Sequence, residues 1–515
     1  MANRANFPSE EELKKAILQE KAKGTPDAEI GRKYGVTFKY IERLITSTQG
    51  LNVSNLNLSK RIKRLHPKDF KEEQTTVWSF KQRGDWATHS GEYRGNWSPY
   101  IPRNVILKYS KPGEIVLDYF CGAGTTAIEC KLLGRRCIAM DINEKAIELA
   151  KRNLDFSLEP EQLKFFPTGG QPEVYEPELR VGDARDLSFL QDNSVDLICA
   201  HPPYANIIHY TDHKEGDLSF YDMDTFLVEM GKVARESFRV LKPNRQCAIL
   251  IGDMRKNRYV VPLGFKLLDV YLDAGFKLRE LVIKRQHNCK TTGFWYARSL
   301  EHNFLLLAHE YLFIFEKPSS DLLLRVKEQD MEYKAIEPVI MKPSVKEKLE
   351  SFETTTVWIL SRERFEECLN KNIVERYSKD GHYTTIVFDF HPIALKFSEE
   401  LKGKKNLLFI KSPFLNSNPS KSMVEEYLEK VKKVVERELP NICKDGFVVL
   451  QTRDVRIDGY IEPLAKRLVD LLEFNELKLK EIVIVTPESS STGTQSHNDY
   501  LKIVHQYLLI YEVIK

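Results

Sequence analysis

The sequence lacks an excess of either sign of charge. Its 515 residues include 77 lysines and arginines against 74 aspartates and glutamates, which gives a formal net charge of +3. Proteins that bind nucleic acid through a uniformly basic surface carry a much larger positive excess. A nucleic-acid partner must therefore be argued from local basic clusters rather than from the overall charge.

Cysteine pairs and long apolar runs are also lacking. The 8 cysteines are scattered, without a CxxC pair or a Cys/His cluster at zinc spacing, so neither disulfides nor a metal site are expected. No run of about 18 apolar residues occurs, and no apolar segment follows the N-terminus, so neither a membrane span nor a signal peptide is expected. These absences predict a reduced, cytoplasmic protein.

Residues 1–55 have the pattern of a small helical domain. An amphipathic segment, residues 10–24, precedes a shorter helical segment, a break at Gly35 and a further helical segment. This order is typical of a helix-turn-helix, which would present Lys39 and Tyr40 to a DNA major groove. A plain three-helix packing module is the alternative.

Residues 56–74 form a basic linker. Four basic residues lie close together there and are candidates for contacts with a phosphate backbone: Lys60, Arg61, Lys63 and Arg64. A solvated charged segment without a ligand is the alternative.

From residue 75 to residue 330, apolar runs alternate with helical patterns. Strands are expected within residues 114–120, 136–142, 195–201, 247–253, 278–285 and 311–317, and helices within residues 125–134, 144–154, 224–241 and 262–275. Such alternation predicts an α/β fold with a mostly parallel, doubly wound, Rossmann-like sheet.

The second half of the sequence repeats part of the first. GDMRKNRYVVPL, from Gly252, and RDVRIDGYIEPL, from Arg453, share Asp, Arg, Tyr and Pro at an offset of 201 residues. The same offset relates FKLRELVI to LKLKEIVI. The offset is 196 for HEYLFIFE and HQYLLIYE, and 280 for two TTVW segments. Several matches in one order predict an internal duplication.

A glycine turn follows the first of the expected parallel strands. The strand ends at Asp118, Gly122 and Gly124 form the turn, and Thr125 opens a helix, so that the backbone can closely approach a ligand at the carboxyl edge of the sheet. The next strand ends in Asp141, about twenty residues later, where ribose hydroxyls need an acceptor.

A third strand end carries Asp183, which is suited to an adenine amino group. Three strand-end acids in this order fit a nucleoside ligand. A nicotinamide-dinucleotide domain is the alternative, and it is disfavoured because the loop lacks the full GxGxxG pattern.

The segment HPPY, His201 to Tyr204, follows a buried apolar run. Its prolines fix the backbone and direct a carbonyl outward, where it can accept a hydrogen bond from an amino group, and Tyr204 offers a ring face to a planar base. Acceptors on both N–H groups of an exocyclic amine restore lone-pair density to its nitrogen, which is catalysis by positioning and electrostatics. A Pro-Pro-Tyr turn without function is the alternative.

DYFCGAGTT (Asp118 to Thr126) and HPPY together resemble the motifs of the DNA amino-methyltransferases, which make N4-methylcytosine or N6-methyladenine. GNWSPYIPRNVILKYSKPGEIVLDYFCGAGTT resembles the cofactor motif of this family run directly into its Gly-rich motif. The resemblance covers residues 75–317. It implies S-adenosylmethionine as cofactor and double-stranded DNA as substrate, and a restriction endonuclease in the same system is a candidate partner.

The resemblance also implies roles for individual residues. The implied cofactor contacts are Ser98, Pro102, Asp118, Phe120, Gly122, Gly124, Thr125, Asp141 and Asp183. The implied catalytic residues are His201, Pro202, Pro203 and Tyr204.

The first position of the catalytic tetrad departs from the family. Asp, Asn or Ser is usual there, with Asp and Asn more often associated with adenine and Ser with cytosine, whereas this sequence has His201. A neutral imidazole can still accept a hydrogen bond. We expect methylation of a flipped base, with cytosine N4 slightly favoured over adenine N6. An RNA or protein-glutamine methyltransferase and a non-enzymatic DNA-binding scaffold are the alternatives.

Residues 283–303 are rich in polar and aromatic side chains, and by position they resemble the family's loop that faces the target base. Lys284, Arg285 and His287 are candidates for phosphate contacts, and Trp295 for filling the gap left by a flipped base. A hairpin that packs its aromatics onto the sheet is the alternative.

Residues 345–515 are expected to form a degenerate methyltransferase-like domain that no longer binds cofactor, because no Gly-x-Gly turn follows a strand there. Its expected role is DNA recognition or pairing with the first copy. One active site per chain, and activity as a monomer through an internal pseudo-dimer, are therefore expected.

Overall fold

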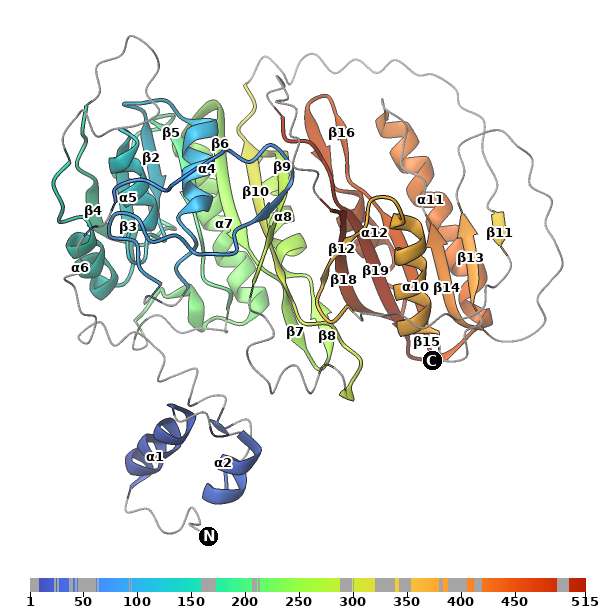
Figure 1. Cartoon of the computed structure of the whole chain (residues 1–515). Coiled ribbons are helices and arrows are strands. Elements are labelled where there is room, and N and C mark those ends of the chain that lie inside the picture. Colours follow the sequence, from blue (N-terminus) through green and yellow to red (C-terminus); the bar gives the residue numbers. More distant parts are fainter. Residues whose placement is uncertain are drawn as a thin grey trace. The chain divides into compact units, whose positions relative to one another are not determined.

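The computed structural model describes residues 9–22, 25, 27–36, 40–41, 44, 62, 64–91, 93, 95–158, 173–205, 211, 214–287, 299, 301–319, 339–341, 353–378, 383–387, 405–411, 419–488 and 500–515. The chain forms two compact units (Figure 1). The first comprises residues 1–71, 82–249 and 292–297, and the second residues 72–81, 250–291 and 298–515. The domain boundaries expected from the sequence stay predictions.

Two short helices open the first unit. α1 (Glu10–Ala22) and α2 (Asp27–Tyr34) enclose a small apolar core that includes Leu13, Ile17 and Ile30. Acidic residues in the first turn of α1 and basic residues in the last turn of α2 suit the helix dipoles.

The predicted DNA contacts of this region are only partly described. Tyr40 is half-buried against the small core and its hydroxyl donates to Glu10 Oε1 at 3.4 Å, so it does not have the exposed position expected for it. Arg64 forms an ion pair with Asp85. Four predicted contacts lie outside the described residues: Lys39, Lys60, Arg61 and Lys63.

A parallel sheet forms the centre of the first unit. Its strands are β2 (Ile115–Asp118), β3 (Arg136–Asp141), β4 (Glu178–Val181), β5 (Val195–Ala200) and β6 (Leu241–Ile251), in the spatial order β6-β5-β2-β3-β4. All neighbours in this order pair in parallel. The helices are α4 (Tyr100–Tyr109), α5 (Thr125–Leu132), α6 (Glu144–Asn153) and α7 (Met223–Val240).

The strand order reverses direction between β2 and β5. Sequence neighbours β3 and β4 extend the sheet on one side of β2, whereas β5 and β6 extend it on the other. In open α/β sheets, ligands bind outside the carboxyl ends of the strands at such a switch point. The loops after β2 and β5, which contain the glycine turn and HPPY, therefore flank the place where a ligand is expected.

The second unit contains a short mixed arrangement and a larger sheet. β1 (Val77–Ser79) pairs in parallel with β9 (Lys277–Arg285), which pairs antiparallel with β10 (His309–Glu316). The hairpin β7 (Met254–Lys256)–β8 (Tyr259–Val261) and α8 (Leu263–Asp273) precede β9.

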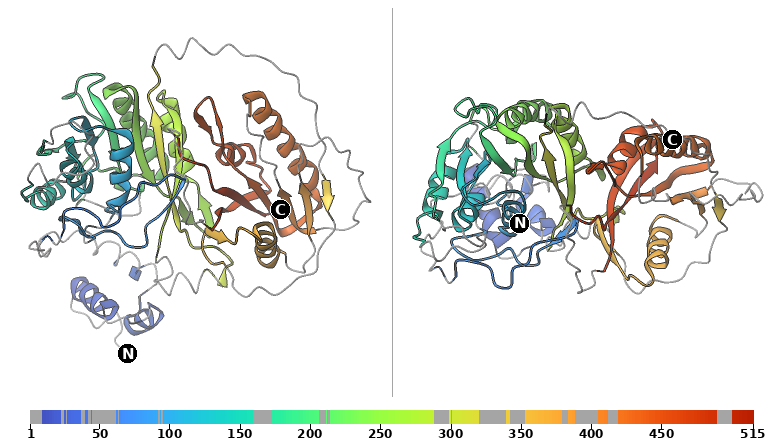
Figure 2. Two further views of the ribbon diagram at one scale, coloured as in Figure 1. Left: turned by 45° about the horizontal axis from the view of Figure 1, so that its top comes forward. Right: turned by 90° about the horizontal axis from the view of Figure 1, so that it is seen from above.

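The larger sheet has the order β11-β13-β14-β15-β19-β18-β12. Its strands are β11 (Val339–Met341), β12 (Val357–Leu360), β13 (Thr384–Val387), β14 (Lys405–Lys411), β15 (Ile442–Thr452), β18 (Leu477–Pro487) and β19 (Gln506–Val513). The hairpin β16 (Val455–Ile457)–β17 (Tyr460–Glu462) and the helices α10 (Phe365–Tyr377), α11 (Lys421–Glu438) and α12 (Leu464–Leu471) complete it. Helices α10 and α11 lie on opposite faces of this sheet (Figure 2).

The second half repeats the strand register of the first. Val77 pairs with Ile283 in β1–β9, and Val357 pairs with Ile484 in β12–β18, at the offsets of 280 and 201 seen in the sequence. Likewise, β9–β10 and β18–β19 pair equivalent residues. β5–β6 and β14–β15 also correspond, since Ile198–Cys247 matches Leu408–Val448.

The connection between β13 and β14 in the second half is too short to hold the elements that the first half has between β2 and β5. Between β2 and β5, the first half contains α5, β3, α6 and β4, with 8, 6, 10 and 4 residues, or 28 in all. Only residues 388–404, a stretch of 17, separate β13 from β14. Seventeen residues cannot hold these four elements.

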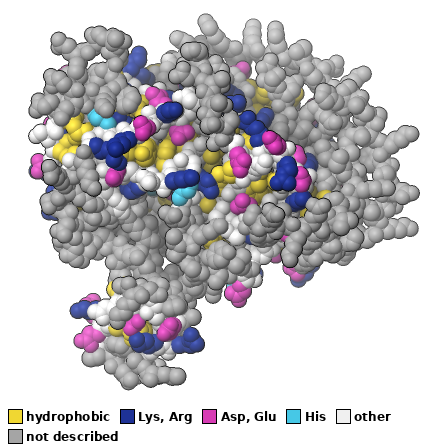
Figure 3. Space-filling model, in the orientation of Figure 1, with side chains coloured by type: hydrophobic (Ala, Val, Ile, Leu, Met, Phe, Trp, Pro, Cys, Tyr) yellow, Lys and Arg dark blue, Asp and Glu magenta, His cyan; other side chains and the backbone are white. Residues whose placement is uncertain are grey.

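The described residues give no structural sign of a membrane span or of a surface of one charge. No helix among them combines the length and apolar character needed to cross a bilayer. On the face shown in Figure 3, their lysines and arginines are interspersed with aspartates and glutamates. The charge distribution thus matches the small net charge of the sequence.

Candidate active site

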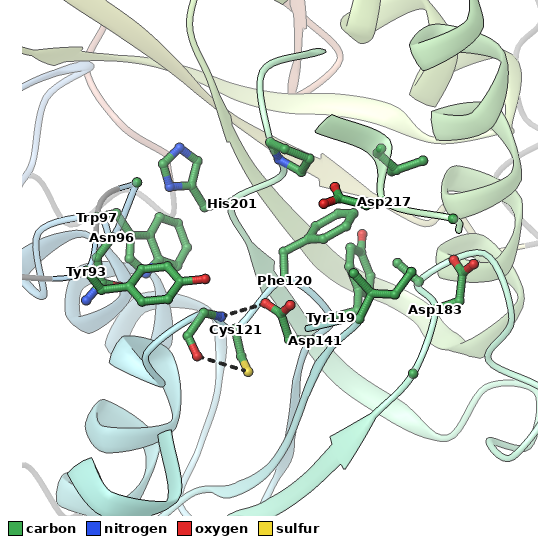
Figure 4. Close-up of a pocket in the computed structure, with 18 residues that line it drawn as sticks. Tyr93, Asn96, Trp97, Tyr119, Phe120, Cys121, Asp141, Asp183, His201 and Asp217 are labelled. Carbon is green, nitrogen blue, oxygen red and sulfur yellow. Dashed lines mark hydrogen bonds between the residues drawn. The ribbon is translucent and has the colours of Figure 1, made fainter. Parts of the chain in front are cut away.

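A pocket of about 700 Å³ lies in the first unit at the carboxyl ends of β2, β3, β4 and β5 (Figure 4). Six residues predicted from the sequence line it: Phe120, Gly122, Asp141, Asp183, His201 and Pro203. Residues that the sequence analysis did not single out complete the lining: Tyr93, Gly95, Asn96, Trp97, Tyr119, Cys121, Ile142, Gly182, Ala184, Gly216, Asp217 and Leu218.

The glycine turn holds the carboxylate of Asp141 at the pocket. Gly122 has φ +50°, and its amide donates to Asp141 Oδ2 at 2.9 Å, while the amide of Asn143 donates to Oδ1 at 2.9 Å. A Cβ on Gly122 would lie 3.0 Å from the ring of Tyr93, so a side chain there would crowd the pocket wall. Burial raises the pKa of Asp141 to about 6.

Asp183 reaches the pocket within an ion pair. The guanidinium of Arg185 donates to both carboxylate oxygens, with Nη2 at 2.5 Å from Oδ2 and Nε at 3.0 Å from Oδ1. Arg185 also donates to the carbonyl of Gly216 at 3.3 Å, a pocket residue with φ +90°. Arg185 therefore connects the loop after β4 to the segment that contains Gly216 and Asp217.

Asp217 adds a third carboxylate that the sequence analysis missed. It is 4% exposed, its Oδ1 accepts from the amide of Ser219 at 2.9 Å, and its Oδ2 accepts from Thr211 Oγ1 at 2.8 Å. In the sequence it is an ordinary cap of the short helix η5 (Leu218–Phe220), so its pattern carried no functional signal.

The HPPY segment enters the pocket from the end of β5. The imidazole of His201 stacks on Trp97, with ring centroids 5.7 Å apart and planes 21° from parallel. Its Nε2 lies 2.9 Å from the hydroxyl of Tyr204. When the proton of the imidazole is on Nε2, the lone pair is on Nδ1. Pro202 is buried and Tyr204 half-buried, and neither lines the pocket.

The segment before α4 supplies the aromatic wall, as Figure 4 shows for Tyr93 and Trp97. Asn96 is fixed there by two hydrogen bonds. Its side-chain oxygen accepts from Thr125 Oγ1 at 2.7 Å, and its carbonyl accepts from Arg83 Nη1 at 2.5 Å. The resemblance pointed to this segment through Ser98 and Pro102, but the residues that reach the pocket lie one to five positions before Ser98: Tyr93, Gly95, Asn96 and Trp97.

A buried carboxylate anchors the start of this segment to α5. Glu129 is 0% exposed and accepts from Trp86 Nε1, His89 Nε2 and Arg103 Nη1 at 2.7, 2.7 and 2.6 Å. Burial opposes the ionisation of Glu129, but Arg103 and His89 outweigh it and lower its pKa. The cluster fixes residues 86–89 against α4 and α5, and so supports the wall formed by residues 93–97.

Five predicted cofactor contacts support the pocket from behind rather than line it. Asp118 is 2% exposed, its Oδ1 accepts from the amide of Phe120 at 3.0 Å, and burial raises its pKa to about 7. Gly124, directly before α5, has φ +83°, and a Cβ on it would lie 3.1 Å from the Cβ of Ala150 in α6. The remaining three are Ser98, whose hydroxyl donates to the carbonyl of Arg83 at 2.6 Å, Pro102, which is buried in α4, and Thr125.

The predicted phosphate contacts of residues 283–303 belong to the second unit. Lys284 pairs with Glu310 at 2.7 Å, and His287 Nε2 lies 3.0 Å from Ser79 Oγ. Burial and the neighbouring charges of Arg285, Lys284 and Lys81 lower the pKa of His287, so these cations gather in one place. Trp295 lies outside the described residues.

The pocket suits a cationic nucleoside. Its three carboxylates, Asp141, Asp183 and Asp217, complement positive charge and accept hydrogen bonds from hydroxyl and amino groups. The rings of Tyr93, Trp97 and Phe120 offer apolar faces. Gly216 brings its backbone close to one of these carboxylates, since a Cβ on it would lie 3.2 Å from Asp183 Oδ2.

Comparison with known proteins gives a family match. The family model described as "DNA methylase", for N6 and N4 methyltransferases, matches residues 16–152 and 195–394, and a methyltransferase-domain model matches residues 110–260. The DNA-methylase match includes the glycine turn, HPPY and the second half as far as β13.

Individual relatives match shorter segments. The type II methyltransferase M.SmaI of Serratia marcescens is 33% identical over 88 residues, 17% of this chain and 29% of the relative. A tRNA (guanine(10)-N2)-dimethyltransferase of Methanothermobacter thermautotrophicus is 33% identical over 114 residues, 22% of this chain and 29% of the relative. The chain thus spans less than a third of the length of either.

A solved structure also matches. It is a putative DNA modification methylase from Thermus thermophilus, complexed with S-adenosyl-L-methionine. It is 27% identical and covers 27% of this chain and 52% of that chain, with a TM-score of 0.20.

Proposed function

The chain belongs to the N6/N4 family of DNA methylases, whose cofactor is S-adenosylmethionine, and we propose that it methylates an exocyclic amino group of a flipped base in double-stranded DNA. One observation carries the proposal. His201 and Pro203, from the end of β5, line the same pocket as Gly122 and Asp141, from the ends of β2 and β3. A methyl donor and a target amine can therefore meet in one cavity.

The cofactor side of the proposal rests on the three carboxylates and the glycine turn. We assign the ribose hydroxyls to Asp141 and the adenine amino group to Asp183, and Phe120 and Gly122 to contacts with the nucleoside. Asp217 is a further acceptor that lines the pocket. Ser98, Pro102, Asp118, Gly124 and Thr125 act by shaping the turn and the wall, since none lines the pocket.

The catalytic side rests on His201 to Tyr204. S-adenosylmethionine, held at Asp141 and Asp183, would supply an electrophilic methyl carbon to the amine nitrogen, with its sulfur as the leaving group. The HPPY carbonyls and His201 Nδ1 are the acceptors that hold the two N–H groups, which directs the nitrogen lone pair away from the ring. The Tyr204 hydroxyl lies 2.9 Å from Nε2, and Nδ1 is able to accept when this hydroxyl accepts from Nε2–H. The amine proton then passes to solvent.

The target base and the DNA contacts are the finer parts of the proposal. Cytosine N4 is slightly favoured over adenine N6, because His201 replaces the Asp or Asn more often associated with adenine. Lys284, Arg285 and His287, clustered in the second unit, are the proposed phosphate contacts.

The test is to express the full chain in a methylation-free host and sequence host DNA and RNA for modified bases. We expect N4-methylcytosine or N6-methyladenine in DNA at a defined sequence. Tyr204→Ala is expected to remove the mark, and Lys411→Ala, at the place in β14 that corresponds to His201, is the matched control that retains it. DNA binding without any methylated base would instead support a non-enzymatic scaffold.

A second candidate function is methylation of an exocyclic amine in RNA. It is favoured by the relative that is a tRNA guanine-N2 dimethyltransferase, which matches 22% of this chain. Guanine N2 is also an amine conjugated with its ring, so the same acceptors would serve. Methylated RNA with unmodified DNA in the same experiment would establish this function and overturn the first.

A further inference from the structure

The second unit contains two arginine–glutamate pairs that are related by the sequence repeat. Arg255 Nη2 donates to Glu481 Oε2 at 2.5 Å, and Arg456 Nη2 donates to Glu280 Oε2 at 2.6 Å. Arg456 and Glu481 are the repeat equivalents of Arg255 and Glu280. Each half therefore donates its arginine to the glutamate of the other half.

The surrounding backbone contacts are exchanged in the same way. Glu481 Oε1 also accepts from the amide of Leu305 at 2.9 Å, and Glu280 Oε1 accepts from the amide of Leu501 at 3.1 Å. Leu305 and Leu501 are again equivalent, at the offset of 196. Both glutamates are 0% exposed, so each depends on an arginine from the other half for charge compensation.

A second exchanged pair joins histidine and threonine. His309 Nδ1 lies 2.9 Å from Thr356 Oγ1, and His505 Nδ1 lies 2.8 Å from Thr76 Oγ1. Thr76 and Thr356 are equivalent residues of the two TTVW segments, and His309 and His505 are equivalent at the offset of 196. The histidine of each half therefore again contacts the threonine of the other half.

Both histidines continue into equivalent buried chains of hydrogen bonds. Nε2 of each lies next to a tyrosine hydroxyl, which donates to an aspartate: Tyr311 to Asp253 at 2.9 Å and Tyr507 to Asp454 at 3.0 Å. Because these groups are buried, we exclude a catalytic role for them and interpret them as the interior of an interface.

Contacts of this kind, in which residue i meets j and j meets i, define an isologous interface, the type that joins the two subunits of a C2 dimer. We propose that the second half of the chain occupies the place of a second subunit, bound permanently to the first half through this interface. The first half holds both members of each exchanged set, Arg255 with Glu280 and Thr76 with His309. Its surface is therefore self-complementary, and the second half covers it.

The proposal explains what the second half has kept and what it lacks. It keeps the strands and hairpin that carry the exchanged contacts, whereas the 17 residues between β13 and β14 cannot hold α5, β3, α6 and β4, which supply Asp141 and Asp183. The partner is thus present without a cofactor site. If the proposed function holds, each binding event transfers one methyl group, because the pocket is lined by residues of the first half.

The association is tested on the full chain with a protease site inserted within residues 320–338. After cleavage, we expect the two pieces to elute together at the 59.8 kDa of the intact chain at micromolar concentration. Separation of the two pieces at that concentration, or elution of the intact chain as a dimer dependent on Arg255, would overturn the proposal.

Charge exchange identifies the interface. In the cleaved chain, Arg255→Glu is expected to raise the dissociation constant of the pieces at least about 100-fold, because it places two carboxylates together. Adding Glu481→Arg restores the pair in reverse and is expected to recover association to within about tenfold. Arg362→Glu, at an exposed position of the second half, is the control without effect. Recovery of association in the double variant would show that Arg255→Glu disrupts the pair and not the fold. If association is not recovered, the assignment of the interface is overturned.

Because association is measured without activity, absence of any DNA mark would refute the proposed function and leave the interface result standing.

Discussion

The two halves of the chain share strands that pair in the same register, but they differ in the residues at the ends of those strands. Arg255 and Arg456 occupy equivalent positions and make equivalent contacts, while the place of His201 at the end of β5 corresponds to Lys411 at the end of β14. Lys411 pairs with Glu366 at 2.9 Å, an ordinary ion pair at a half-buried position.

This difference separates two kinds of constraint. A buried charge in the interface depends on its partner in the other half, so neither half can lose its arginine or its glutamate without leaving an uncompensated charge. The pocket does not depend on a partner residue in the second half, because every residue that lines it comes from the first unit. An interface can therefore persist in both halves while a site persists in one.

The largest expected effect is at Glu129, in α5 of the first unit. Glu129→Ala leaves Arg103 buried without its carboxylate and is expected to destabilise the first unit by about 3–5 kcal/mol. The free energy is measured by urea unfolding followed by tryptophan fluorescence. Glu148→Ala, an exposed change on α6, is expected to stay within about 0.5 kcal/mol. Similar losses in both variants would contradict the role of the cluster.

The catalytic contrast between the halves is tested at equivalent positions. His201→Ala removes an acceptor for the reacting amine and is expected to slow methyl transfer by about 100- to 1000-fold in a single-turnover assay. Lys411→Ala is expected to leave the rate within about twofold, because Lys411 does not line the pocket that contains His201. Comparable losses would mean that the second half takes part in the chemistry.

A smaller effect is expected from pH, through Asp141. Its pKa is raised to about 6, so the carboxylate is ionised above that pH and becomes protonated below it. The ionised form is the better acceptor for two hydroxyls, so cofactor affinity is expected to be constant above pH 7 and to fall by about tenfold per unit below pH 6. Calorimetric titration measures the affinity. Asp141→Asn should bind weakly at every pH, and a pH dependence retained in this variant would assign the effect to another group.

The smallest effect is expected for phosphate contacts, which the second half does not duplicate. In β18, Val485 and Thr486 stand where β9 has Lys284 and Arg285. Lys284→Ala and Arg285→Ala are each expected to lower the slope of log affinity for DNA against log salt by about 1, with Val485→Ala unchanged. An unchanged slope in both the lysine and the arginine variant would move the DNA contact elsewhere.

Much of the fold could be read from the sequence because its signals are local. The alternation of apolar runs and helical patterns located β2, β3, β5, β9 and β10 to within a few residues, and the repeated GDMRKNRYVVPL pattern anticipated the register shared by the halves. β6 is longer than expected, since LKPNRQ extends the apolar run CAILI at its amino end.

The site was less accessible to sequence reasoning. Gly122, Asp141 and His201 follow strands of one parallel sheet, so their position at one edge could be inferred. Trp97 and Asp217 reach the pocket from loops, and nothing in their local spacing indicates which strand end they face. Asp118 shows the reverse case: it ends a strand, but its carboxylate turns back to the amide of Phe120 and shapes the turn instead of facing the cavity.

The short connection between β13 and β14 has an evolutionary consequence. Point mutations can exchange Lys411 for histidine, but no sequence of substitutions can supply the strands and helices that 17 residues are too few to form. A second pocket built like the first would therefore require an insertion between β13 and β14.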